Sequence, residues 1–289
     1  MIYADHAATT KISETAKLAM LSAMEKDWYN PSSLYTPGQQ ASGTLMDARV
    51  RIAHCLGCLP KEIYFTSGGS EADNQAILSA AAIGKRQGKM HIISTAFEHH
   101  AVLHTLKKLE KEGFEITLLD VGEKGIVSPV QVEKAIRPDT ILVTVMYANN
   151  EIGTIQPIRE IGAICRKNGV LFHTDAVQAA GHLQINVEKD QIDMLSLSAH
   201  KFNGPKGIGV LYAKTGVFLT NLIEGGGQER GKRAGTENLP AIVGMVAALE
   251  EACSLQKERS IYVTKLRDQL IDGLKKIPGA LLNGDATNR

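Results

Sequence analysis

Residues 140–175, TILVTVMYANNEIGTIQPIREIGAICRKNGVLFHTD, contain the pattern that decides the fold. The stretch begins with an apolar run, Thr140–Tyr147, and ends with a second one, Val170–Thr174. Between them, Pro157–Asn168 has helical spacing with proline near its start, and Gly169 follows where helices commonly stop. Strand, helix and strand in this order predict two parallel strands joined by a crossover helix.

The same alternation continues on both sides of this unit. Further strands of this sheet are predicted at Glu62–Thr66, His91–Thr95, Glu115–Asp120, Met194–Ser198 and Gly209–Ala213, and a separate strand is predicted to begin near the end of the chain, at residues 278–283. Helices are predicted at Glu71–Gln87, with Ser70 as its N-cap, and at Val102–Glu112, Pro129–Ile136 and residues 239–276. Several strands are almost entirely apolar, as strands covered on both faces tend to be. The sequence therefore predicts an α/β fold with a mainly parallel seven-stranded sheet flanked by helices.

Composition excludes several classes of protein. The 289 residues include 32 Lys+Arg and 31 Asp+Glu, a net charge of +1, which argues against a generally cationic nucleic-acid binder. The longest apolar runs, such as Ala241–Leu249, are too short to cross a bilayer, and the N-terminus has no signal-peptide pattern. Four cysteines are too few for a disulfide framework. We expect a cytoplasmic protein without a membrane segment.

Residues with chemical potential follow the predicted strands. In open α/β sheets, binding sites form at the carboxyl ends of the strands, so these residues should share one edge. They are Ser67-Gly68-Gly69-Ser70-Glu71, Glu98-His99, Asn149-Asn150, Asp175 with Gln178, and Ser198-Ala199-His200-Lys201. The glycine-rich loop before Ser70 is neither a Walker loop nor a GxGxxG fingerprint, so a phosphate cradle and a structural turn both remain open.

Two of these residues suggest the kind of cofactor. Lys201 follows an apolar strand, and a partly desolvated lysine can form a Schiff base, although a surface lysine is the ordinary alternative. Asp175 ends another apolar strand, where a carboxylate needs a partner. A protonated pyridine nitrogen, as in pyridoxal 5'-phosphate (PLP), would serve; a helix N-cap or a structural salt bridge is the alternative.

No metal site is predicted. His100 and His104 could share a helix face, with His99 nearby, but no HExxH motif or third ligand accompanies them. The Cys55-Leu56-Gly57-Cys58 pair stands alone and indicates buried or incidental thiols.

Eight motifs in order extend the argument: YADHAATT, NPSSLYTPGQQA, FTSGGSEADNQAI, EHHAVL, ANNEIGTIQPI, HTDAVQAAGH, SLSAHKFNGPKGIG and GGGQERGKRAGTENL. Together they resemble the cysteine desulfurases of the class V aminotransferase superfamily, the sulfur donors of iron–sulfur clusters. The resemblance covers nearly the whole chain. It implies the PLP-dependent transferase fold type I. The large PLP-binding domain would be residues 13–250, and residues 1–12 and 251–289 would be part of an incomplete small α+β domain.

The resemblance also implies roles for individual residues. Lys201 would hold PLP covalently and act as acid and base, Asp175 would face the pyridine nitrogen, and His99 would stack on the ring. The phosphate would be bound by Gly69, Ser70, Ser198 and His200, and by Thr236 of a partner subunit. Gln178 and Asn150 would hydrogen-bond the phenolic oxygen of the ring or hold the substrate. These roles imply a homodimer with shared sites.

The implied reaction converts L-cysteine to L-alanine and passes the sulfur, as a persulfide, to a scaffold or acceptor protein. In the family, the catalytic cysteine and the arginine that grips the substrate carboxylate follow the point where this chain ends. None of Cys55, Cys58, Cys165 and Cys253 has the expected Ser/Gly/Ala-rich context. We therefore expect a C-terminally truncated desulfurase. A selenocysteine lyase, an aminotransferase and a non-catalytic PLP-binding interaction protein are the alternatives.

Overall fold

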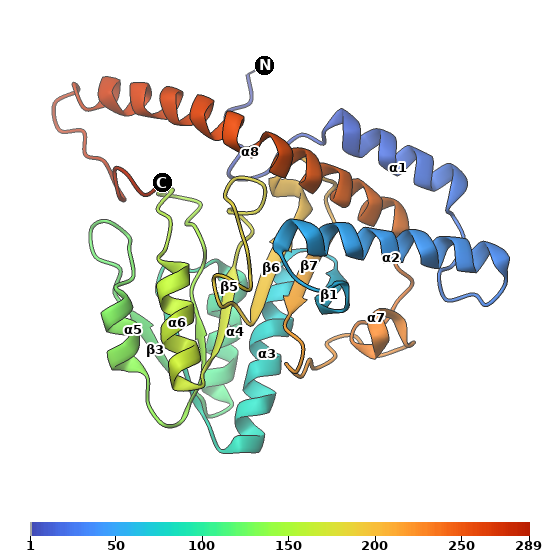
Figure 1. Cartoon of the computed structure of the whole chain (residues 1–289). Coiled ribbons are helices and arrows are strands. Elements are labelled where there is room, and N and C mark those ends of the chain that lie inside the picture. Colours follow the sequence, from blue (N-terminus) through green and yellow to red (C-terminus); the bar gives the residue numbers. More distant parts are fainter. Residues whose placement is uncertain (1) are drawn as a thin grey trace.

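The apolar runs of the sequence form one seven-stranded sheet in the computed structural model, which describes residues 2–289 (Figure 1). The strands are β1 (Ile63–Thr66), β2 (His91–Thr95), β3 (Glu115–Leu119), β4 (Thr140–Thr144), β5 (Leu171–Asp175), β6 (Met194–Ser198) and β7 (Gly209–Ala213). Their order across the sheet is β1-β7-β6-β5-β4-β2-β3; β7 runs antiparallel to both of its neighbours, β1 and β6, and all other pairs are parallel. The predicted mainly parallel α/β sheet is confirmed.

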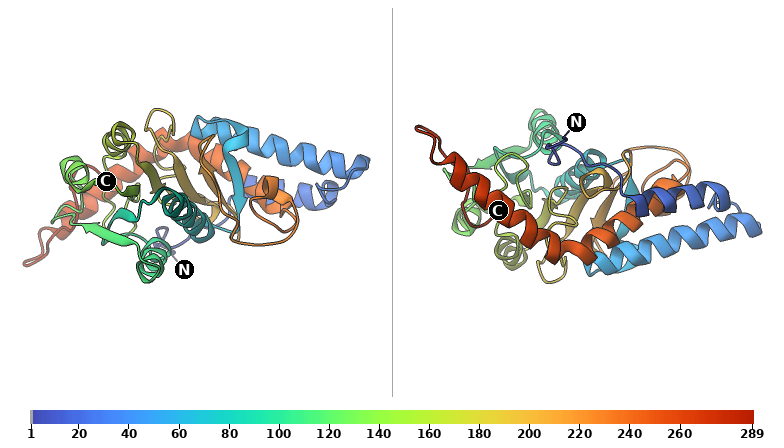
Figure 2. Two further views of the ribbon diagram at one scale, coloured as in Figure 1. Left: turned by 90° about the horizontal axis from the view of Figure 1, so that it is seen from below. Right: turned by 90° about the horizontal axis from the view of Figure 1, so that it is seen from above.

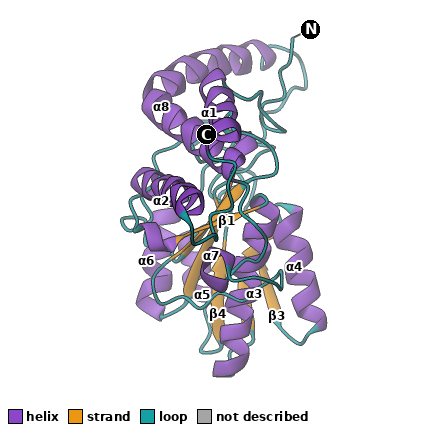
Figure 3. Cartoon of the chain, turned by 90° about the vertical axis from the view of Figure 1, so that its right-hand side faces the viewer, coloured by secondary structure: helices purple, strands orange, loops and turns teal. Residues whose placement is uncertain are grey.

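Helices cover both faces of this sheet (Figures 2 and 3). They are α1 (Glu14–Lys26), α2 (Thr36–Leu56), α3 (Gly69–Gln87), α4 (His100–Lys111), α5 (Pro129–Ala135), α6 (Ile158–Asn168), α7 (Gln228–Gly231) and α8 (Leu239–Leu274). The side chains of α3 and α4 share one apolar cluster with one face of the sheet. Those of α2, α5, α6 and the first half of α8 form a larger cluster with the other face. All strands except β7 therefore end at the same edge, where loops carry the polar residues.

Two predicted boundaries were wrong for local reasons. Helix α3 begins at Gly69 with Gly68 as its N-cap, so Ser70 lies inside the helix and does not cap it. Strand β4 ends at Thr144, not at Tyr147. Beyond Thr144, the Val145 and Tyr147 amides still donate to His173 O and Asp175 O of β5, at 3.2 and 2.8 Å, whereas the Met146 amide donates to the Glu98 carboxylate at 2.9 Å and not to a strand.

The strand predicted at residues 278–283 does not form. These residues follow α8 as turns and irregular chain, and no strand edge lies beside them in the described residues. Their continuation returns to the body, where the Asp285 amide donates to Thr154 Oγ1 at 3.0 Å and Asn288 O accepts from the Ile155 amide at 2.9 Å. The backbone N–H and C=O groups of a strand need hydrogen bonds to a neighbouring strand. Here the continuing loop forms its hydrogen bonds with residues 154 and 155 instead.

Helix α8 is the one helix among residues 2–289 that is long and apolar enough to pass a test for a membrane span. More than half of its most apolar window, 56%, is buried inside the protein. Leu239, Ile242, Met245 and Leu249 belong to the larger apolar cluster. This burial is that of a core helix, and the C-terminal half of α8 extends beyond the sheet (Figure 1).

Candidate active site

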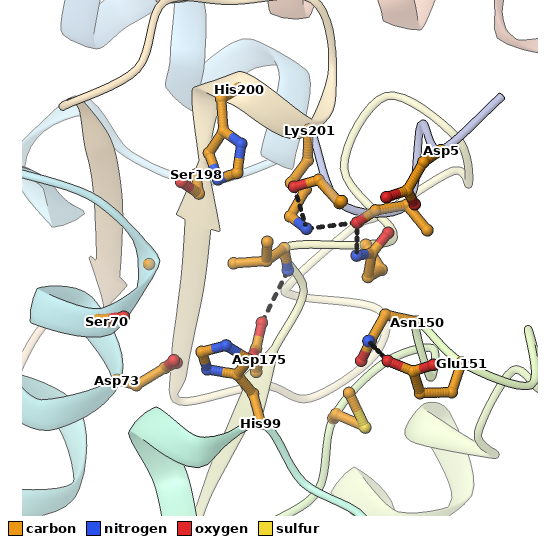
Figure 4. Close-up of a pocket in the computed structure, with 16 residues that line it drawn as sticks. Asp5, Ser70, Asp73, His99, Asn150, Glu151, Asp175, Ser198, His200 and Lys201 are labelled. Atoms are coloured by element: carbon orange, nitrogen blue, oxygen red, sulfur yellow. Dashed lines mark hydrogen bonds between the residues drawn. The ribbon is translucent and has the colours of Figure 1, made fainter. Parts of the chain in front are cut away.

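A cavity of about 650 Å³ lies at the edge where the parallel strands end (Figure 4). Nine of the ten predicted site residues line it: Gly69, Ser70, His99, Asn150, Asp175, Gln178, Ser198, His200 and Lys201. They come from the last residues of β5 and β6 and from the segments that follow β1, β2, β4, β5 and β6. The topology therefore brings together residues that are more than a hundred positions apart in the sequence.

The glycine-rich loop forms one wall of the cavity. Gly68 has a φ of 155°, a conformation that favours glycine, and no side chain caps the helix that follows. A Cβ on Gly69 would lie 2.7 Å from Val177 Cγ2, so the close approach to the loop after β5 requires glycine here. The free amides at the start of a 19-residue helix, with the hydroxyls of Ser70 and Ser198 beside them, form a cradle that suits a phosphate group.

Lys201 lies in a short 3-10 helix, η2 (Ala199–Lys201), directly after β6. Its amine donates to Ala8 O at 3.0 Å and also to Ala7 O. Burial lowers the pKa of Lys201, while the Asp175 carboxylate acts in the opposite direction. A lysine with a lowered pKa has a larger fraction of neutral, nucleophilic amine at physiological pH.

Hydrogen bonds hold the N-terminal segment, residues 7–13, against η2 and the residues that follow it. The Thr10 amide and hydroxyl both donate to His200 O, at 2.8 and 2.7 Å, and Asn203 Nδ2 donates to Lys11 O at 2.9 Å. His200 Nδ1 lies 3.0 Å from Thr9 Oγ1, and burial lowers the pKa of this imidazole. The segment therefore forms the wall of the cavity opposite the glycine-rich loop.

Asp175 is a buried carboxylate without a positively charged partner in the described residues. It is 5% exposed, and its Oδ1 accepts the Val177 amide at 2.9 Å. Burial raises the pKa of Asp175, and no salt bridge within residues 2–289 includes it. A cation that entered the cavity would stabilise its ionised form, and the protonated nitrogen of a pyridine ring is such a group.

The polar side chains at the mouth of the cavity have partners within the protein. His99 is the N-cap of α4 and accepts the Ala101 amide through Nδ1 at 3.1 Å. Gln178 Nε2 donates to Ala7 O at 2.9 Å, and Asn150 Nδ2 donates to Glu151 Oε1 at 2.7 Å. Gln178 and Asn150 thus lie in the cavity, and their amides remain available to exchange these contacts for a ligand.

Thr236 is the one predicted site residue that the structure does not bring to this cavity. It is exposed and lines a separate space of about 250 Å³ beside Ser67 and Arg233. This position agrees with the expectation that Thr236 acts on a partner subunit, which stays a prediction. None of the four cysteines lines the main cavity, and all four are free thiols.

Sequence reasoning missed several cavity residues. Asp5, Asp73, Met146 and Glu151 also line it. The signal for Asp73 was its position four residues after Gly69, one helical turn into α3 and on the same face. One side-chain atom each of Asp73, His99 and Asp175 lies within 4.8 Å of the others.

The fold and the site define an α/β protein whose cavity places a lysine of lowered pKa and a buried carboxylate beside a helix N-terminus that suits an anion. The family model "Aminotransferase class-V" matches residues 2–289. A cysteine desulfurase IscS from Methanosarcina thermophila is 52% identical over 288 residues, covering 100% of this chain and 71% of that protein. A putative cysteine desulfurase IscS 1 from Bacillus subtilis is 48% identical, covering 98% of this chain and 75% of that protein.

Solved structures of similar proteins have the same fold. A NifS-like protein superposes with a TM-score of 0.94 at 39% identity, covering 98% of this chain and 78% of that chain. SspA in complex with cysteine superposes with a TM-score of 0.83 at 43% identity, covering 86% of this chain and 72% of that chain. The chain belongs to the class V aminotransferase family and, within it, to the cysteine desulfurases.

Proposed function

We propose that this chain is a PLP-dependent cysteine desulfurase that converts L-cysteine to L-alanine and transfers the sulfur as a persulfide. The observation that carries the proposal is the placement of Lys201 and Asp175 on one cavity with the N-terminus of α3. SspA, a structural relative, was solved in complex with cysteine, which supports L-cysteine as the substrate.

The residues of the cavity fit PLP. When bound, PLP supplies an electron sink that allows bonds of an attached amino acid to break. Lys201 would attach the cofactor covalently and then move protons at the substrate. Asp175 would hold the proton on the ring nitrogen, because that cation satisfies its buried carboxylate. The amides of Gly69 and Ser70, with Ser198 and His200, would bind the phosphate.

The other predicted residues would orient the ring and the substrate. His99 lies beside Asp175 at the cavity wall and would stack on the ring (Figure 4). Gln178 and Asn150 would hydrogen-bond the phenolic oxygen or the substrate. Because no cysteine lines the cavity in residues 2–289, the thiol that takes the sulfur must reach it from elsewhere.

The proposal includes a homodimer. Thr236 is exposed and lies outside the cavity of its own chain, so it could complete the phosphate site of a second copy. Exposed large apolar side chains gather on α1, α2 and the loop between them: Leu18, Leu21, Met24, Trp28, Leu34, Tyr35, Met46 and Val50. An apolar surface of this kind marks an interaction site in a soluble protein.

Three further assignments belong to the same proposal. The large domain comprises residues 13–250, and residues 1–12 and 251–289 belong to a small domain. The sulfur goes to an acceptor or scaffold protein for iron–sulfur cluster or thio-cofactor assembly. The compartment is the cytoplasm, where free thiols such as the four in this chain stay reduced.

The decisive experiment is the absorption spectrum of the purified chain with PLP, before and after addition of L-cysteine. We expect a band of covalently bound PLP that shifts with L-cysteine but not with the same concentration of 3-mercaptopropionate, which lacks the amino group. The Lys201→Ala variant should give only free PLP after borohydride treatment and denaturation, whereas Lys206→Ala should behave as wild type. A borohydride-stable adduct in Lys201→Ala would contradict the assignment of the lysine.

A further inference from the structure

A row of buried polar side chains crosses the sheet beneath the cavity. Thr144 on β4, His173 on β5 and Ser196 on β6 are each 0% exposed, and Asp73 on α3 is 1% exposed. His173 Nδ1 lies 2.8 Å from Thr144 Oγ1, and His173 Nε2 lies 3.0 Å from Ser196 Oγ and 3.6 Å from Asp73 Oδ1. Buried polar groups are costly unless paired, so a row within an otherwise apolar interface calls for a function.

Asp73, at one end of the row, lies beside Asp175. Asp73 and Asp175 line the same cavity, with Asp73 on the α3 side (Figure 4). Their nearest carboxylate atoms lie within 4.8 Å of each other, and Asp73 Oδ1 has no hydrogen-bond partner among the described residues. Two carboxyl groups thus share one buried space, and one of them carries an unsatisfied oxygen.

Only one of these two carboxyl groups can be ionised at low cost, because like charges at this separation repel in a buried site. Asp175 faces the positive side of the cavity, where Lys201 and His99 favour its carboxylate. Asp73 faces negative neighbours instead. Burial and then Asp175 raise the pKa of Asp73 well above its usual value; Ser196 acts in the opposite direction, and Glu98 adds a weaker upward effect.

No cation compensates Asp73 from the sheet side. His173 is its only basic neighbour in the row, and burial lowers the pKa of His173 to about 3. Both imidazole nitrogens lie against hydroxyl groups, which satisfies a neutral ring. Glu98 accepts from Thr95 Oγ1 at 2.7 Å and from the Met146 amide, and burial raises its pKa to about 8.

We propose that Asp73 is a positioning residue: buried beside Asp175 and facing only the uncharged side chains of the Ser196–His173–Thr144 row, it keeps its proton, so that Asp175 alone carries the charge that faces the ring nitrogen of PLP. The inference deepens the proposed function and rests on it. The pair then presents one negative charge to the single positive charge of the protonated ring. Two ionised carboxylates would leave an uncompensated charge in a buried site.

The protonation of Asp73 can be read directly by infrared spectroscopy of the folded wild-type chain at pH 7, with and without PLP. Protonated carboxyl groups absorb apart from carboxylates, and carbon-13 labelling of aspartate separates Asp73 from Glu98. We expect one protonated aspartate that remains after PLP is bound and disappears in Asp73→Asn. Glu98→Gln, the matched control, should leave that band in place. A wild-type spectrum without a buried protonated aspartate would overturn the proposal.

The effect on the cofactor is measured by titrating PLP into the variants. Because asparagine is also neutral and of the same shape, Asp73→Asn should keep the PLP dissociation constant within about twofold of wild type. Asp175→Asn, which removes the one charge, should raise it by about tenfold or more. A tenfold change in Asp73→Asn, with wild-type thermal stability, would show that Asp73 acts as an anion. If wild type bound no PLP, the proposed function would fail, and the infrared result would still report on Asp73.

Discussion

At the scale of single residues, the amine of Lys201 is under two opposing influences. The carbonyls of Ala7 and Ala8 accept from its protonated form, while burial favours the neutral form and lowers its pKa. The balance sets how readily the cofactor attaches, because only a neutral amine can attack a carbonyl carbon.

The attachment of PLP should therefore depend on pH in a definite direction. As pH rises, Lys201 loses its proton and the rate of attachment increases, levelling off above its pKa in the folded protein. The midpoint should lie below about 10.4, the value of an ordinary lysine. Stopped-flow absorbance over a pH series measures it, with free butylamine as the reference amine. A midpoint equal to that of the reference would show that burial has no effect on Lys201.

The four thiols should differ in reactivity. Cys253 is exposed, and a hydrogen bond from Cys55 lowers its pKa, although burial opposes this. Burial raises the pKa of Cys58 to about 12, and Cys165 is 0% exposed. Because the thiolate is the reactive form, iodoacetamide should modify Cys253 first. Peptide mass spectrometry over a time course checks this. Faster labelling of Cys58 or Cys165 would contradict it.

At the scale of elements, the contact between the start of α3 and the loop after β5 should control the phosphate cradle. Gly69→Ala would place a methyl group 2.7 Å from Val177 Cγ2 and displace the amides of the helix start. We expect weaker PLP binding by roughly tenfold, a loss of one or two hydrogen bonds to the phosphate. The double variant Gly69→Ala/Val177→Ala removes the clash and should recover most of the affinity. No recovery would point to a cause other than this contact.

A buried ion pair joins α2, α7 and β1. Arg49 and Glu229 form a bidentate pair with side chains 5% and 1% exposed, and Glu229 also accepts the Phe65 amide at 2.9 Å. Glu229→Ala would leave Arg49 buried without its partner. We expect a loss of about 3–5 kcal/mol in the free energy of unfolding, measured by urea denaturation. Arg51→Ala, which breaks a half-exposed pair with Glu250, should cost about 1 kcal/mol or less.

The elements also show how far sequence reasoning reaches. Strands β2, β6 and β7 have the predicted ends, because each is an apolar run limited by turn residues. The strand expected at residues 278–283 fails, because apolar composition cannot supply a neighbouring edge. Asp73 was not predicted as a site residue for a similar reason. Its spacing from Gly69 places it on the cavity face of α3, but the neighbours on which its role depends, His173 and Ser196, belong to two other elements, and the local sequence does not show such contacts.

At the scale of the whole molecule, we expect two copies of the chain to associate. Light scattering should give twice the 31.2 kDa of one chain. Trp28→Glu, in the apolar surface of α1 and α2, should shift the population to monomers, and Leu281→Glu, which is even more exposed but far from that surface in sequence, should not. A wild-type monomer at micromolar concentration would contradict the dimer and the assigned role of Thr236.

The order of the strands has a consequence for how the protein is made. Strand β1 has one neighbour, β7, and pairs with it from Ile63↔Tyr212 to Thr66↔Gly209. During translation, β1 leaves the ribosome before its partner β7, the last strand, has been synthesised. Ile63 and Phe65, which are buried in the folded protein, remain exposed until then. The nascent chain therefore carries an unpaired apolar strand for roughly 7–30 seconds, at roughly 5–20 residues per second. Chaperones that bind extended apolar segments should bind this segment before the later strands. The yield of folded protein should fall most when such chaperones are scarce.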